Sequence, residues 1–93
     1  MISGSRRYRV DVNRSAVRAL AALPRRVQEN VARVLDTLAE NPRPAGTVAL
    51  KGFGGLYRPR IAGDYRVIYR VDDDARAVVV RVIGHRRDVY RSL

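Results

Sequence analysis

The fold of this 93-residue chain is decided by residues 63–83, GDYRVIYRVDDDARAVVVRVI. Within this stretch, Tyr65 to Val71 and Ala77 to Ile83 are rich in the β-branched and aromatic residues that favour strands. Asp72-Asp73-Asp74 lies between them and supplies a turn. Strands joined by so short a connection pair most simply as an antiparallel hairpin, so we place this hairpin at the centre of a sheet.

Further strands are predicted before the hairpin. Leu56 to Ile61 precedes it directly and is joined to it by the turn Ala62-Gly63-Asp64. Arg7 to Val12 alternates apolar and polar residues with the period of a half-buried strand. Pro59 lacks the backbone N–H that a sheet ladder needs, so we expect a distortion where it interrupts its strand.

Helical periodicity fills the region between the first strand and residue 41. Asn13 or Ser15 can cap a first helix that runs to about Leu23. Its inward residues are expected to be Val17, Leu20 and Ala21.

A second helix follows, because Pro24 fits a first helical turn and Asn41-Pro42 disfavours continuation. Its apolar stripe consists of Val27, Val31, Val34, Leu35 and Leu38. We read the following segment, through Gly52, Gly54 and Gly55, as a loop. The order β-α-α-β-β-β predicts a single α+β domain over residues 1–93. In it, a helical hairpin covers one face of a curled, mainly antiparallel four-stranded sheet.

Composition excludes several kinds of chemistry. The chain has no cysteine and one histidine, which rules out thiolate chemistry and argues against a zinc site, so we expect no metal and no cofactor. No apolar run approaches the roughly 20 residues that cross a bilayer. The start, MISGSRR, lacks the apolar run of a signal peptide, so we expect a cytoplasmic protein without a membrane partner.

Charge points to the kind of partner. The chain has 19 Lys and Arg against 9 Asp and Glu, a net charge of +10 and a pI near 11.3, which predicts a polyanionic or acidic partner. From Asn41 to Val71 the only acid is Asp64. The bases in the same segment are Arg43, Lys51, Arg58, Arg60, Arg66 and Arg70. We therefore expect the functional surface in the second half of the chain.

Three of these arginines are expected on one surface. Arg58 and Arg60 are two residues apart, so they share a face in an extended strand, and Arg66 on the next strand can reach it. Guanidinium groups bind phosphate bidentately and stabilise charge that develops on it. Lys51 and Arg70 are expected to contact RNA nearby. The alternative is a set of solvated or Asp-paired surface arginines, and a one-residue register slip would move the set to the other face.

A second cluster lies in Gly84 to Tyr90. Tyr90 can stack on a base or exchange a proton, or it can simply pack the tail. His85 alone has an unperturbed pKa near neutrality, although a lone histidine after a strand is more often a hydrogen-bonded surface residue. Arg86 and Arg87 face opposite ways in an extended chain, so we expect Arg86 to reach the catalytic site and Arg87 to contact RNA.

From Tyr8 to Tyr90 the chain resembles the RelE/ParE superfamily of bacterial toxins, and the RelE branch in particular. The resemblance rests on the blocks GDYRVIY at 63–69 and GHRRDVY at 84–90, supported by NP at 41–42, LKG at 50–52 and LYR at 56–58. It implies a toxin of a type II toxin–antitoxin system that cuts mRNA in the ribosomal A site without a metal. The RNA 2′-hydroxyl attacks the adjacent phosphate and leaves a 2′,3′-cyclic phosphate and a 5′-hydroxyl. The implied partners are a cognate antitoxin, the ribosome and mRNA.

By position, the resemblance implies catalytic roles for five residues: Arg58, Arg60, Arg66, Arg86 and Tyr90. His85 is a further candidate. It matches Lys51 to a basic residue at the RNA-binding edge. Arg58 and Arg60 stand where some relatives have lysines. Because an arginine can scarcely act as a general base, proton removal would fall to Tyr90, His85 or the ribosome. Two alternatives stay open: a ParE-like inhibitor of DNA gyrase without nuclease activity, and a degenerate toxin without catalysis.

Overall fold

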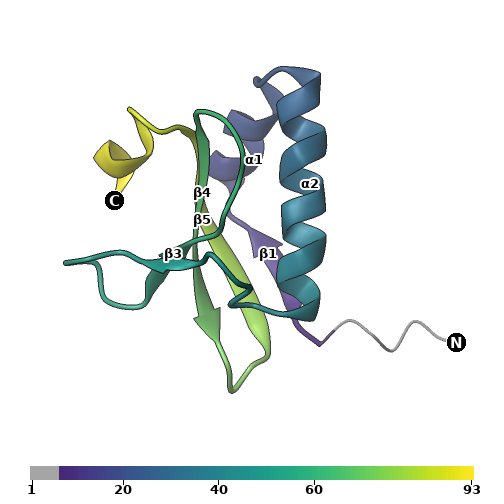
Figure 1. The fold of residues 1–93 in the computed structure, drawn as a ribbon, viewed down its shortest axis with the longest axis vertical. Coiled ribbons are helices and arrows are strands. Elements are labelled where there is room, and N and C mark those ends of the chain that lie inside the picture. The colour runs from purple at the N-terminus through teal and green to yellow at the C-terminus, as the bar shows by residue number, and fades with distance from the viewer. Residues whose placement is uncertain (1–6) are drawn as a thin grey trace, which may run out of the picture.

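The computed structural model describes residues 7–93, and residues 1–6, where the sequence predicts no signal peptide, lie outside the described residues. The elements in chain order are β1 (Arg9–Val12), α1 (Arg14–Ala21), α2 (Arg25–Glu40), β2 (Val48–Ala49), β3 (Leu56–Arg58), β4 (Tyr65–Asp72), β5 (Ala77–His85) and a 3-10 helix (Val89–Ser92). In Figure 1 both helices lie on one side of the sheet, and the C-terminal segment lies on the other.

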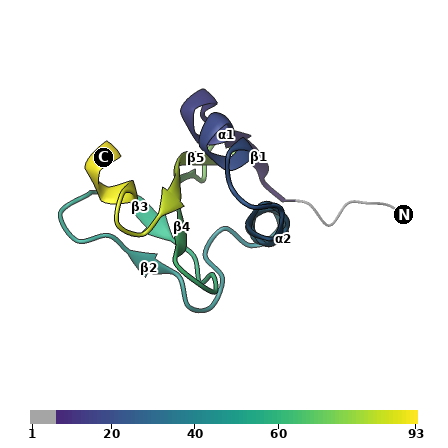
Figure 2. The same ribbon diagram turned by 90° about the horizontal axis from the view of Figure 1, so that it is seen from above.

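The sheet has the strand order β1-β5-β4-β3-β2, which Figure 2 shows from above. β4 and β5 pair antiparallel from Tyr65↔His85 to Asp72↔Ala77, as predicted, and β1 joins β5 in parallel. The α+β fold, with a helical hairpin on a mainly antiparallel sheet, is therefore confirmed. The sheet has five strands and not four, because Val48–Ala49 pairs with β3 inside the predicted loop. A two-residue strand is too short to show a period of two in the sequence.

An extra residue interrupts the central pairing. Ile68 pairs with Val82 and Tyr69 pairs with Val80, so Arg81 has no partner on β4. Such a β-bulge bends the strand and increases its twist. The bulge falls where β1 ends, since Val12↔Val80 is the last pair of the parallel strand.

Apolar residues pack on both faces of the sheet. The main cluster lies under the helices and includes Val67, Tyr69, Val80, Val31 and Leu38. A smaller cluster on the opposite face joins Leu56, Ile68 and Val89, with Leu50, Val82 and Leu93 packed against it. The stripe predicted for α2 is confirmed, since its five residues all belong to or pack against the main cluster.

Some local predictions are wrong. Val17, expected to face inward, is 50% exposed, whereas Ala16 is 2% exposed. Eight residues of α1 give little periodicity to read, and the small Ala16 side chain allows α1 to approach β5. The strand predicted to reach Ile61 ends earlier, at Arg58. It ends immediately before Pro59, the site of the expected distortion. Asn13 is the N-cap of α1, but its side chain makes no capping hydrogen bond.

The Tyr69 hydroxyl provides a test of how the segment after α2 is held. It donates a hydrogen bond of 2.6 Å to the Pro42 carbonyl, and Tyr69 is fully buried. Burial raises the pKa of Tyr69, which keeps the hydroxyl protonated and able to donate. Tyr69→Phe leaves the Pro42 carbonyl without this donor, so we expect a loss of about 1–2 kcal/mol in the free energy of unfolding, measured by urea titration. Tyr90→Phe, at a 41% exposed position, is the control and should change stability by less than about 0.5 kcal/mol. Equal losses in the two variants would contradict this role of the hydroxyl.

Candidate functional site

Three arginines share the face of the sheet that lies opposite the helices. On β4, Arg66 and Arg70 alternate with Val67 and Tyr69 of the main cluster, so they lie on the same face as Ile68. Leu56 pairs with Arg70, and this register continued by two residues sets Arg58 beside Ile68. We call Arg58, Arg66 and Arg70 the arginine face. The predicted grouping of Arg58 with Arg66 on one surface is thus present in the structure.

Arg66 and Arg86 converge on the turn before β4. The Arg66 guanidinium donates to the carbonyls of Gly63 and Tyr65, each at 3.0 Å. The Arg86 backbone N–H donates to the Asp64 carbonyl at 2.6 Å, and its Nε lies 3.6 Å from the Asp64 carboxylate. Both groups of the Arg86–Asp64 pair are about 60% exposed, so water screens the pair and leaves Arg86 available to an incoming anion.

The C-terminal 3-10 helix lies against the same face. Arg66 pairs with Gly84, and a side-chain carbon added at Gly84 would lie 3.5 Å from the Val89 side chain. Val89 is 1% exposed, whereas the next residue, Tyr90, is 41% exposed. Burial of Val89 therefore holds Tyr90 at the border of the arginine face with its ring accessible.

His85 lies on the other face. It pairs with Tyr65, and its ring meets the Tyr65 ring edge-on at a centroid distance of 5.6 Å. Tyr65 alternates with Arg66, so both rings lie on the side of the helices. The Arg87 backbone N–H donates to Nδ1 of His85 at 3.2 Å, which assigns the ring proton of a neutral His85 to Nε2. The catalytic role of His85 stays a prediction.

Arg60 is not placed beside Arg58 by strand alternation, because β3 has already ended. Its side chain lines a hollow next to α2 with Val34, Thr37, Pro44, Ala45 and Pro59. A Cβ at Gly46 would lie only 3.0 Å from the Cβ of Arg60, so the two segments are in close contact. The catalytic role of Arg60 therefore also stays a prediction.

The RNA-binding residues predicted outside the arginine face are both exposed. Lys51 lies at the tip of the β2–β3 hairpin and Arg87 lies between β5 and the 3-10 helix. Phe53 and Arg81 are also exposed, and the sequence reasoning overlooked both of them. A lone aromatic residue among glycines was the available signal for Phe53. The bulge that presents Arg81 has no signal in the sequence.

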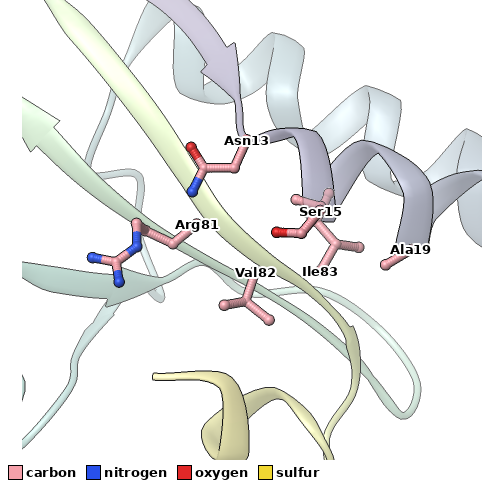
Figure 3. Close-up of a pocket in the computed structure, with 7 residues that line it drawn as sticks. Asn13, Ser15, Ala19, Arg81, Val82 and Ile83 are labelled. Carbon is pink, nitrogen blue, oxygen red and sulfur yellow. The ribbon is translucent and has the colours of Figure 1, made fainter.

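A second hollow lies where β1 turns into α1. It has a volume of about 250 Å³ and is lined by Asn13, Ser15, Ala16, Ala19, Arg81, Val82 and Ile83. In Figure 3 the Arg81 guanidinium points away from Ser15. The charged group therefore does not face Ser15, and no residue of the arginine face lines this hollow.

Arg43 joins three segments at the other end of the sheet. Its guanidinium donates two hydrogen bonds to the Asp73 carboxylate, at 3.0 and 3.3 Å, and lies 5.3 Å from the centre of the Tyr57 ring. The Tyr8 hydroxyl donates to the same carboxylate at 2.7 Å. The hydrogen bonds from Arg43 and Tyr8 lower the pKa of Asp73, and the bond to Asp73 raises the pKa of Tyr8. This network ties the start of β1, the loop after α2 and the β4–β5 turn together.

Two further findings concern residues 7–93. No three His, Cys, Asp or Glu side chains in this range are grouped so that they could hold a metal ion. None of the helices described there has the length and apolar character required to span a membrane.

Comparison with known proteins identifies the family to which this chain belongs. Residues 7–90 match the family model described as the ParE toxin of the type II toxin–antitoxin system parDE. Toxin RelG of Mycobacterium tuberculosis is 33% identical over 85 residues, which are 90% of this chain and 97% of RelG.

Solved structures agree. The crystal structure of the archaeal RelE–RelB complex from Pyrococcus horikoshii matches with a TM-score of 0.74 and 33% identity, over 86% of this chain and 96% of that chain. The intact RelBE toxin–antitoxin complex of E. coli matches with a TM-score of 0.74 and 28% identity, over 84% and 95% of the two chains. The chain belongs to the RelE/ParE family of type II toxins and is a RelE-like toxin of a RelBE-type toxin–antitoxin system.

The Asp73 network predicts a specific pH dependence. Because the pKa of Asp73 is lowered below its ordinary value of 3.8 in the folded protein, its ionised form stabilises the fold above pH 3.8. That stabilisation is lost as the pH falls through the lowered value. Asp73→Asn should therefore lower the melting temperature at about pH 6 and have a smaller effect at about pH 3, below the ordinary pKa of the carboxyl group. Asp74→Asn, in the same turn, is the control. A deficit in Asp73→Asn that is the same at both pH values would show that the ionised carboxylate is not the cause.

Proposed function

We propose that this toxin is a ribosome-dependent, metal-independent endoribonuclease that cuts mRNA in the cytoplasm and so arrests translation. The observation that carries the proposal is the placement of Arg58, Arg66 and Arg86 around one sheet face with Tyr90 at its border. The arginines of this surface fit a reaction on a phosphodiester, because guanidinium groups hold phosphate oxygens in a planar, bidentate geometry.

The reaction needs charge stabilisation and two proton transfers. The RNA 2′-oxygen forms a bond to phosphorus while the bond from phosphorus to the 5′-oxygen breaks, which yields a 2′,3′-cyclic phosphate and a 5′-hydroxyl. Negative charge on the non-bridging oxygens rises in the transition state, and the arginines are the groups that stabilise it. Arginine cannot accept the 2′-hydroxyl proton at working pH.

Proton transfer is therefore assigned to other groups. A neutral tyrosine can donate a proton, and Tyr90 is accessible at the border of the arginine face, so it is the candidate donor to the leaving 5′-oxygen. The base for the 2′-hydroxyl is then His85 or a group of the ribosome. Cleavage would require the ribosome if the ribosome supplies this base and orients the mRNA.

The cognate antitoxin is the second proposed partner. RelE homologues of this chain have been solved as complexes with RelB antitoxins. A net charge of +10 favours an acidic or amphipathic segment that wraps the toxin and neutralises its basic surface. Antitoxin binding would then block the access of RNA to the arginine face.

Single arginine substitutions test the catalytic assignment. Arg66→Ala and Arg86→Ala should each reduce cleavage by about 10²- to 10³-fold, since each removes one donor to the transition state, and should relieve growth arrest. Antitoxin binding should remain largely intact in both variants. Arg26→Ala, on the exposed side of α2, is the matched control and should remain toxic. Full toxicity of both variants would contradict the catalytic roles proposed for Arg66 and Arg86.

A second candidate function is the inhibition of DNA gyrase without nuclease activity. It is kept because residues 7–90 match a family model described as a ParE toxin. Mapping transcript ends after expression separates the two. Codon-phased cuts confined to translated messages are expected for the nuclease. DNA damage without such cuts would favour the gyrase inhibitor, and absence of growth arrest would favour a degenerate toxin.

A further inference from the structure

The tip of the β2–β3 hairpin presents an aromatic ring that the proposed chemistry does not use. Phe53 is the only phenylalanine of the chain and is 37% exposed. It belongs to neither of the two apolar clusters. In Figures 1 and 2 the hairpin extends from the sheet on the same side as the C-terminal segment.

The backbone of the tip has a defined conformation. Leu50 N–H donates to the Leu56 carbonyl at 2.9 Å, Phe53 N–H to the Leu50 carbonyl at 3.3 Å, and Leu56 N–H to the Phe53 carbonyl at 3.1 Å. Gly52 and Gly55 both have a φ of +80°, a conformation that glycine adopts at little cost. The hairpin is thus an ordered turn that presents Phe53.

The space around the tip is open. A Cβ added at Gly52, Gly54 or Gly55 would meet no atom of the described chain within 4 Å beyond the adjacent residues. A flat group of a ligand can therefore approach the backbone beside Phe53. Side chains larger than glycine at these positions would occupy that space.

The basic residues near Phe53 in the sequence indicate which kind of ligand the tip can bind. Lys51 is two residues away, Arg58 ends the strand that follows the tip, and no acid occurs between Asn41 and Asp64. A ligand that combines negative charge with flat apolar groups fits this surface. Single-stranded RNA has both, because its phosphates alternate with bases that can stack on an aromatic ring.

We propose that Phe53 is a base-stacking residue that holds an unpaired base of RNA while Lys51 contacts the adjoining phosphate. The proposal rests on the RNA-directed function proposed above and names a further substrate contact for it. Stacking on one aromatic side chain changes affinity by about tenfold or more. Phe53 then fixes the position of the RNA strand relative to the arginine face.

A fluorescence experiment tests the stacking directly. The chain contains no tryptophan, so Phe53→Trp creates a protein with a single tryptophan, at the tip, which can be excited selectively over the five tyrosines. The probe is a single-stranded 2′-O-methyl RNA oligonucleotide, which cannot be cleaved because its 2′-oxygens are blocked. Binding should quench the tryptophan, because a base stacks on the indole. Val17→Trp, at a 50% exposed position of α1, is the matched control and should show little quenching.

Affinities from a labelled probe complete the test. Phe53→Leu keeps an apolar side chain without an aromatic face, so its affinity for the probe should fall by about tenfold, and that of Phe53→Trp should be retained. Equal affinities for the native protein and Phe53→Leu would overturn the proposal and would point to a protein partner at the tip. Equal quenching in Phe53→Trp and Val17→Trp would also overturn it. Because this probe cannot be cut, the result is separate from the cleavage assay: stacking without cleavage would sink the nuclease proposal alone.

Discussion

Burial of β4 on both of its faces is the constraint on which the rest of the structure depends. Val67, Ile68 and Tyr69 are consecutive, and each is 0% exposed. Since adjacent strand residues point to opposite faces, the helices can cover only two of these three side chains. Ile68 must find other cover, and Leu56 and Val89 provide it. The C-terminal segment therefore packs on the arginine face to bury an apolar core residue, and this packing brings Tyr90 to the border of that face.

The same strand fixes the position of the hairpin that follows the helices. Tyr69 packs in the main cluster, and its hydroxyl holds the carbonyl of Pro42, where the chain leaves α2. Arg43, the next residue, is bound to Asp73 at the β4–β5 turn. The segment that leads into β2 is thus attached twice to the central hairpin before it reaches Lys51 and Phe53. The tip is short and exposed, yet Leu50 and Leu56 at its base pack in the smaller apolar cluster.

The long elements could be predicted from the sequence because each repeats its period several times. The α2 stripe and the β4–β5 hairpin are of this kind. Alternation along β4 also predicts that Arg66 and Arg70 share a face, although it cannot say which face. The failures occur where the signal is short or non-local: β2 has two residues, α1 has eight, and the bulge at Arg81 depends on pairing with β4. Arg43 and Asp73 are 30 residues apart, and no local pattern links them.

The choice of arginine over lysine separates charge from proton transfer in the proposed site. Guanidinium groups stay protonated at any working pH, so the grip on phosphate should not titrate in the range where the ribosome functions. A lysine at these positions could lose its proton and act as a base, but an arginine cannot. His85, the only imidazole of the chain, lies on the side of Tyr65 and the helices and not on the arginine face. In the proposed reaction, this arrangement would stabilise the reacting phosphate but would offer few means of activating the 2′-hydroxyl. The proposed dependence on the ribosome would then follow from the arginine pattern as well as from the need to reach mRNA.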